Sequence, residues 1–193
     1  VDIWHQHPAN PENPADIQAA EDGNERTYRS YLDPIFKGEY SRYLLDCMEK
    51  EGSMPDIRPG DMKRISAPID FFGLNCYNRV VTSADDTKPE TVEQTGGNFL
   101  DNGTEFYPKA VYDAIKMMHE RYGIKIPIYI TENGTYNCSE EIVDGKIHDA
   151  DRIKYVEGFL KWIEKAIDEG YDVRSYYLWS LMDNFEWSAG NSF

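Results

Sequence analysis

A glutamate at the end of an apolar run is the first residue here that could do chemistry. Glu132 follows the run Ile126–Ile130 with one threonine between them, so it lies where a buried strand would end. Burying a carboxylate without a partner is costly, and in α/β folds the carboxyl ends of the strands line the active site. By itself, Glu132 is more simply explained as a surface or salt-bridging residue, so its neighbours must decide.

Two other apolar runs end in residues that suit a sugar. One reaches Asn75 and Tyr77, and the other leads into Trp179, Glu186 and Trp187. Hydrolysis of a glycosidic bond needs carboxyl groups held against a ring that carries many hydroxyls. The amide and the second carboxylate could bind those hydroxyls, the tyrosine could orient a carboxylate, and the tryptophans could stack on the ring. A single aromatic side chain is more often part of the core, but together at strand ends these residues indicate a carbohydrate site.

A pair of histidines near the start of the chain could instead bind a metal ion. His5 and His7 have the spacing His-x-His. Zinc sites use three or four protein ligands, and no third ligand stands out in the sequence. We therefore expect no metal site, and hydrolysis by carboxylates requires no cofactor.

The elements that must position these residues alternate between strands and helices. Apolar runs of strand length end near Trp4, Asn75, Thr131 and Leu181. Between them lie segments in which apolar residues recur at helical spacing. The expected helices span 14–28, 108–121 and 151–169, with Gly123 and Gly170 as C-terminal stops. This alternation predicts parallel strands joined by crossover helices. Four such units form half of an eight-stranded barrel or most of an open doubly wound sheet, and periodicity does not choose between them.

Three connecting segments have no clear periodicity. We expect 28–68 to be irregular with at most a short helix near 40–49, 82–102 to be a polar surface loop, and 132–148 to be a loop. No internal repeat interrupts the pattern. The residues 1–193 are therefore expected to form one continuous domain or part of one.

The charge and the cysteines exclude several classes of protein. A net charge of −15, from 35 acidic and 20 basic residues, disfavours binding to nucleic acid or to anionic membranes. No apolar run approaches the roughly 20 residues of a membrane span. Three cysteines without a C-x-x-C pair suggest a reducing cytoplasm. Secretion stays open, because the sequence does not begin with Met and a leader could precede it.

Four segments of the chain resemble motifs of the family 1 glycoside hydrolases. Residues 128–134, Ile-Tyr-Ile-Thr-Glu-Asn-Gly, resemble the family's nucleophile motif, and 70–77, Asp-Phe-Phe-Gly-Leu-Asn-Cys-Tyr, resemble the strand before it. Residues 177–187 are similar to the family's Trp-Ser-Leu-x-Asp-Asn-Phe-Glu-Trp segment, and 32–40 to a linker pattern. The four matches occur in the family's order and cover nearly the whole chain. The resemblance implies a (β/α)8 TIM barrel and a β-glucosidase.

The resemblance also implies a role for each matching residue. Glu132 matches the catalytic nucleophile, Tyr77 matches the tyrosine that holds the nucleophile's carboxylate, and Asn75 lines the same site. Trp179 matches the platform beneath the bound sugar. The pair that reads the sugar's hydroxyls is matched by Glu186 and Trp187. A cysteine at position 76 replaces the family's usual aromatic residue, which we interpret as a packing change.

The chain departs from the family in what it lacks. The acid/base glutamate of that family lies in a Thr-x-Asn-Glu-Pro motif, and no Asn-Glu-Pro occurs in this sequence. We therefore expect strands five to eight of the barrel, with the acid/base glutamate on a missing amino-terminal half, and no activity from this chain alone. The partners expected are that half and a β-glucoside or oligosaccharide substrate. Two alternatives stay open, a 6-phospho-β-glycosidase and a truncated, inactive sugar-binding fragment. The resemblance does not choose between glucose, galactose and fucose.

Overall fold

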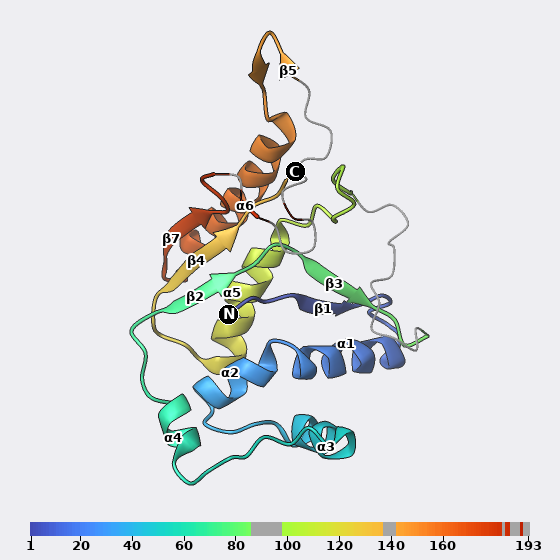
Figure 1. Ribbon diagram of the computed structural model, residues 1–193, viewed down its shortest axis with the longest axis vertical. Coiled ribbons are helices and arrows are strands. Elements are labelled where there is room, and N and C mark those ends of the chain that lie inside the picture. Colours follow the sequence, from blue (N-terminus) through green and yellow to red (C-terminus); the bar gives the residue numbers. More distant parts are fainter. Residues whose placement is uncertain (86–97, 137–141, 183, 186–189, 191–193) are drawn as a thin grey trace.

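The computed structural model describes all residues except 86–97, 137–141, 183, 186–189 and 191–193. The described residues form six helices and seven strands (Figure 1). In chain order they are β1 (His5–Pro8), α1 (Pro14–Arg26), α2 (Arg29–Phe36), α3 (Arg42–Glu51), α4 (Asp61–Ile65), β2 (Phe72–Asn75), β3 (Arg79–Thr82), α5 (Lys109–Tyr122), β4 (Ile128–Asn133), β5 (Ile142–Val143), β6 (Lys146–Ile147), α6 (Ala150–Asp168) and β7 (Val173–Leu178).

Parallel strands form the wall of the structure, as the alternation predicts. One sheet has the order β2-β4-β7, and a second pairs β1 with β3. A bridge between Asp2 and Asn75 joins the two, because the segment before β1 pairs with the end of β2. The parallel segments therefore follow one another in the order of the sequence. Within the described part of the chain they form an open wall, and no closed barrel is present.

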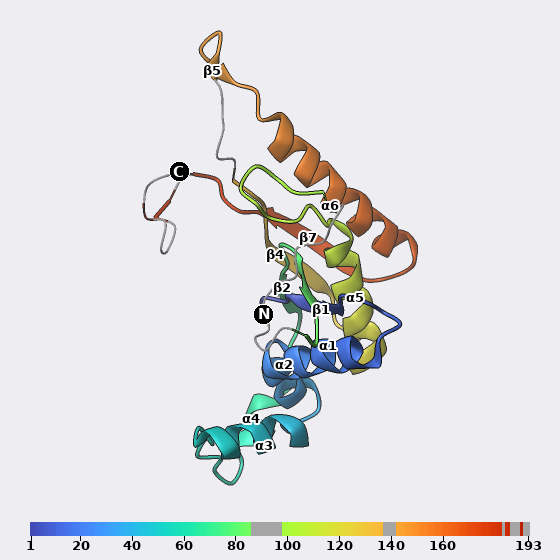
Figure 2. The same cartoon turned by 90° about the vertical axis from the view of Figure 1, so that its right-hand side faces the viewer.

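The long helices cover one face of this wall. Figure 2 shows α5 and α6 on the same side of β2, β4 and β7. Helix α5 ends at Gly123, which adopts a left-handed conformation with φ of 60° and donates its N–H to the carbonyl of His119. Both helices bury apolar residues against the strands. In α6, however, Ile153, Leu160 and Ile167 share the expected apolar periodicity and are exposed.

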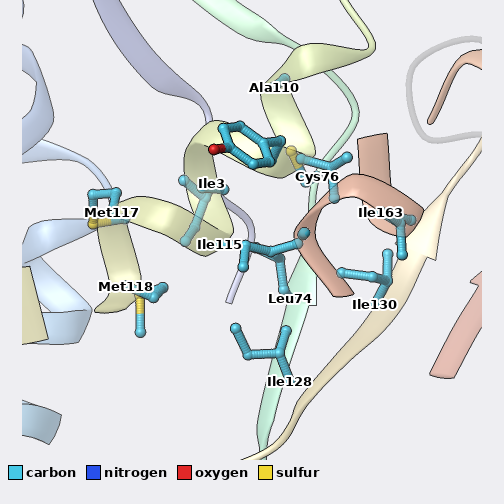
Figure 3. Packing of buried hydrophobic residues seen from close by; sticks show 14 of the residues in the cluster. Ile3, Leu74, Cys76, Ala110, Ile115, Met117, Met118, Ile128, Ile130 and Ile163 are labelled. Carbon is cyan, nitrogen blue, oxygen red and sulfur yellow. The ribbon is translucent and has the colours of Figure 1, made fainter. Parts of the chain in front are cut away.

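Alternate strand residues supply the apolar core between the two layers. Leu74 of β2 and Ile128 and Ile130 of β4 are fully buried, and Figure 3 shows them beside Ile115 of α5 and Ile163 of α6. Because successive strand residues point to opposite faces, the residues between these apolar ones point away from the helices. The strand residues that do not contribute to this core therefore form the face of the sheet opposite α5 and α6.

Several sequence-based expectations about the connections were wrong. The segment 28–68 contains three helices, α2, α3 and α4, instead of one short helix at most. Helix α3 has a side-chain N-cap at Ser41 and a left-handed Gly52 at its end, and both signals are visible in the sequence. Strand β3 lies just before the polar loop expected over 82–102, and no strand was expected there.

The expected loop 132–148 also holds regular structure. Strands β5 and β6 form a short antiparallel hairpin across Asp144 and Gly145, whose φ angles are 51° and 73°. Positive φ at both turn residues is what an Asp-Gly hairpin turn requires. Among the described residues, no helix is both long and apolar enough to cross a membrane.

Candidate active site

Glu132 lies near the carboxyl end of the central strand β4, opposite Asn75 of β2. Its main-chain carbonyl accepts a hydrogen bond from the N–H of Cys76 at 3.1 Å. The register shifts between Leu74 and Asn75 at this point. Such a bulge redirects the side chains that follow it. The backbone that carries Glu132 is thus held by its neighbour at the mouth of the sheet.

The hydroxyl of Tyr77 donates a hydrogen bond to Glu132 Oε2 at 2.9 Å. The two residues are 55 positions apart, and the pairing of β2 with β4 brings them together. A hydrogen bond to a carboxylate fixes its orientation and stabilises its charged form. With one oxygen held by the phenol, the other oxygen of Glu132 is the one that can approach a reacting atom.

Asn75 lies beside this pair. Its Oδ1 accepts a hydrogen bond from Thr131 Oγ1 at 2.6 Å, which leaves the amide nitrogen as the group suited to donate to a ligand. Thr131 precedes Glu132 in β4, so the amide is oriented by the strand that carries the carboxylate. The structure therefore gathers Asn75, Tyr77 and Glu132 at the carboxyl ends of two adjacent strands.

Trp179 follows directly after β7, the other neighbour of β4. Its main-chain N–H donates to the main-chain carbonyl of Asn133 at 2.9 Å, and 43% of the residue is exposed. The peptide bond between Trp179 and Ser180 is cis. The partly exposed side chain of Trp179 gives an aromatic surface at the end of β7, the strand that pairs with the strand of Glu132. Glu186 and Trp187 lie outside the described residues, so the structure does not place them.

Gly134 explains part of the sequence that follows the glutamate. A Cβ built at this position would lie 2.1 Å from the main-chain oxygen of Trp179, closer than real Cβ atoms come to other atoms. Only glycine lets the backbone after Glu132 approach the backbone of Trp179 this closely. The sequence-based reading treated this residue as part of a motif and gave it no physical role.

Asn133 is a second residue that the sequence-based reading missed. It is fully buried, and its Nδ2 donates to the carbonyl of Cys76 at 2.7 Å. The available signal was an amide residue directly after Glu132, close to the end of the apolar run Ile126–Ile130. Together with the bond from Trp179, this contact ties the ends of β2, β4 and β7 to one residue.

The residue at position 76 has no chemical role in this arrangement. Cys76 is fully buried in the apolar core, and that burial raises the pKa of its thiol, so the thiol stays protonated. This fits the interpretation of a packing change.

The two histidines of β1 lie apart from the carboxylate. The rings of His5 and His7 are 4.8 Å apart, with Tyr28 against the first ring and Tyr107 against the second. Burial, followed by the charges of His7 and Arg29, lowers the pKa of His5 to about 4. In the described part of the chain, no three His, Cys, Asp or Glu residues are grouped as metal ligands would be.

Comparison with known proteins assigns the whole chain to one group. The profile described as "Glycosyl hydrolase family 1" matches residues 1–193. "Beta-glucosidase A" of Acetivibrio thermocellus is 36% identical over 98% of this chain and 43% of its own length. "6-phospho-beta-glucosidase GmuD" of Bacillus subtilis is 35% identical over 91% of this chain and 41% of its own length.

Solved structures give the same result for the fold. A β-glucosidase from Exiguobacterium marinum superimposes with a TM-score of 0.90 at 33% identity, over 100% of this chain and 44% of that protein. The β-glucosidase from Thermotoga maritima in complex with glucoimidazole superimposes with a TM-score of 0.88 at 33% identity. That match covers 99% of this chain and 42% of the Thermotoga protein. The chain therefore spans less than half the length of the relatives it matches.

Proposed function

Because this chain belongs to glycosyl hydrolase family 1, we propose that it is the nucleophile-bearing part of a retaining β-glucosidase. The observation that carries the proposal is the bond of 2.9 Å from the Tyr77 hydroxyl to Glu132 at the strand mouth. The general acid/base carboxyl group comes from an amino-terminal half, and the polypeptide that joins the two halves is the complete enzyme. No metal or cofactor takes part.

The four parallel segments correspond to strands five to eight of a (β/α)8 barrel. Their pairing order along the chain supports this assignment, as does the match to β-glucosidase structures over 42–44% of those proteins. Among the described strands, β7 pairs with β4 alone, so its other edge can receive a strand of the missing half. Barrel closure removes such edges and covers the inward face with layers of side chains.

The reaction proceeds by two displacements. In the first, a carboxylate oxygen of Glu132 attacks the anomeric carbon, the bond from that carbon to the leaving oxygen breaks, and the acid group protonates that oxygen. In the second, the same group removes a proton from water, whose oxygen attacks the anomeric carbon and releases Glu132 as a carboxylate. Two inversions retain the configuration of the sugar. Tyr77 holds Oε2 through both steps and leaves Oε1 to form the covalent bond.

The remaining site residues bind the sugar. Trp179 offers its exposed indole face to the C–H groups of the ring, and Asn75 donates its amide to a hydroxyl near the nucleophile. We assign Glu186 and Trp187, from the sequence motif, to the hydroxyls at the far side of the ring.

We also place the protein in the cytoplasm, where the free thiols of Cys47 and Cys76 would persist.

The product configuration tests the reaction class. Proton NMR of the complete enzyme acting on an aryl β-glucoside should show β-glucose as the first product, before mutarotation. Initial release of α-glucose would contradict the double displacement. The complete enzyme with Glu132→Gln, which keeps the size of the side chain and removes its charge, serves as the matched control and should release neither.

A second candidate activity is hydrolysis of 6-phosphorylated glucosides, since one of the relatives carries that name. The carboxylate at position 186 argues against it. A carboxylate within about 4–6 Å of a phosphate dianion costs several kcal/mol in a site shielded from water. Matched aryl β-glucosides with and without a 6-phosphate should show a higher kcat/KM for the unmodified substrate. The opposite order would favour the second activity, and Glu186→Ser should shift the ratio toward the phosphorylated substrate.

A further inference from the structure

A hydrogen-bond network, buried at Asn133 and Tyr155 and partly buried at Tyr176, surrounds the residue that follows Glu132. Its centre is the side chain of Asn133, which accepts a bond from the hydroxyl of Tyr176 at 2.7 Å. The same side chain donates to the hydroxyl of Tyr155 at 3.2 Å and to the carbonyl of Cys76 at 2.7 Å. Each polar group of this amide is therefore used, and a fully satisfied buried network specifies one geometry.

Tyr155 connects this network to the residue that holds the nucleophile. Its hydroxyl donates to the main-chain carbonyl of Tyr77 at 2.9 Å while it accepts from Asn133. It comes from α6, in the outer helix layer, and its ring packs against Phe159 with centroids 4.6 Å apart. Burial raises the pKa of the hydroxyls of Tyr155 and Tyr176, the latter to about 12, so both are neutral donors near neutral pH.

We propose that Tyr155 and Tyr176 are positioning residues for the nucleophile, acting through Asn133 and the main chain of Tyr77. Neither hydroxyl contacts Glu132. Tyr176 fixes the amide of the residue that follows Glu132, and Tyr155 fixes both that amide and the backbone of Tyr77. The bond between Tyr77 and Glu132 is thereby held from both strands. This inference rests on the proposed function of Glu132.

The energetic reason is that chemistry depends steeply on position. A displacement of about 1 Å can cost a reaction roughly a hundredfold in rate. Loss of the Tyr155 hydroxyl removes its hydrogen bond to the carbonyl of Tyr77. The Tyr77 side chain, and with it the carboxylate of Glu132, can then move by less than about 1 Å. We therefore expect a loss of about tenfold in the rate of attack by Glu132, with little change in sugar binding, because the network is centred on the fully buried Asn133.

The test compares two phenylalanine variants of the complete enzyme. Tyr155→Phe keeps the ring and removes the hydroxyl. Tyr112→Phe is the matched control, because the Tyr112 hydroxyl bonds Glu169 at 2.6 Å, four residues before β7 begins. Each variant is reacted with 2-deoxy-2-fluoro-β-glucosyl fluoride, and the rate constant and the dissociation constant of trapping are measured separately. We expect Tyr155→Phe to lower the rate constant about tenfold and to change the dissociation constant less than about twofold. Tyr112→Phe should change neither, although both variants lower the melting temperature.

A double variant tests whether Tyr155 acts through Tyr77. In a Tyr77→Phe background, adding Tyr155→Phe should lower the trapping rate constant by a further factor of less than about two. The bond from the Tyr77 hydroxyl to Glu132, which Tyr155 is proposed to hold in place, is already absent in that background. Full additivity would overturn the proposed route. If Tyr155→Phe does not fold, Tyr176→Phe decides in the same assay, since it removes the other hydroxyl bound to Asn133.

The outcomes separate this inference from the function on which it rests. Failure of the unmodified complete enzyme to trap the reagent would overturn the proposed function and this inference with it. Trapping by the unmodified enzyme, with equal rate constants for Tyr155→Phe and Tyr112→Phe, would overturn this inference alone.

Discussion

Replacing Gly134 with alanine should damage the site without touching a charged or hydroxyl group. The added Cβ would lie 2.1 Å from the carbonyl oxygen of Trp179 and 3.2 Å from its carbonyl carbon. Cβ contacts below 3.0 Å are essentially never seen, so the two backbones must separate by about 1 Å. Since the obstacle is main chain, no side-chain rotation can relieve the clash.

The expected cost follows from what must move. Overpacking costs about 1–3 kcal/mol, and the weakened bond from the Trp179 N–H to Asn133 adds about 0.5–1.5 kcal/mol. We expect Gly134→Ala to lower the free energy of unfolding of the complete enzyme by about 1.5–4.5 kcal/mol. A shift of about 1 Å between Glu132 and the sugar platform should lower kcat/KM roughly a hundredfold.

Urea unfolding and steady-state kinetics with an aryl β-glucoside measure the two effects. The matched control is Gly73→Ala in β2, where the nearest atom to an added Cβ is the Thr131 methyl carbon at 3.3 Å. A methyl group on a side chain can yield by a few tenths of an ångström, so the control should lose less than about 1 kcal/mol. Equal losses in the two variants, or kinetics of Gly134→Ala that match the unmodified enzyme, would refute the steric argument.

Three further outcomes are expected. Tyr77→Phe should lower kcat/KM of the complete enzyme about 10–100-fold, because a hydrogen bond to a charged group contributes about 1.5–3 kcal/mol; unchanged kinetics would remove Tyr77 from the mechanism. Acid should destabilise the protein through His5, whose pKa falls from 6.5 to about 4 on folding. Its contribution is present above pH 6.5 and is lost as the pH falls toward 4, by up to about 3 kcal/mol. Urea midpoints between pH 7 and pH 4 check this, and His5→Gln should make that decline shallower. Finally, residues 1–193 alone should hydrolyse an aryl β-glucoside negligibly and self-associate, because they lack an acid group and leave an unpaired strand edge; a monomer with the turnover of the complete enzyme would contradict this.

The sequence was most informative where periodicity is long and regular. Helices α5 and α6 each continue an apolar stripe over several turns, and the glycine after α5 ends it where expected. Strands β2 and β4 were found because they are apolar runs that end in polar residues, and β7 corresponds to the strand expected after the stop of the last helix at Gly170. Their parallel pairing followed from the crossover helices alone.

Short elements were missed because a few residues carry little periodicity. Helix α4 has five residues and β5 and β6 have two each, too few for a pattern to repeat. The hairpin still had a local signal, since Asp144 and Gly145 form a dipeptide that favours a tight turn. The choice between a barrel and an open sheet had no such signal, because it depends on pairings that the described strands do not complete.

The site divided in a similar way. The types and order of Asn75, Tyr77, Glu132 and Trp179 could be read from the sequence, because each lies at or just after the end of an expected strand. The roles of Asn133 and Gly134 could not, since both depend on contacts with β2 and β7 that only the fold creates. Local patterns identify polar and aromatic residues at strand ends more readily than residues that hold those in place.

The most direct measurement of the central claim is to identify the residue that carries the sugar. The complete enzyme is incubated with 2-deoxy-2-fluoro-β-glucosyl fluoride, digested with a protease and mapped by tandem mass spectrometry. We predict one modified residue, Glu132, and no label in Glu132→Ala, whose turnover should fall by several orders of magnitude. A label on any other residue, or full activity in Glu132→Ala, would contradict the assignment of Glu132 as the nucleophile.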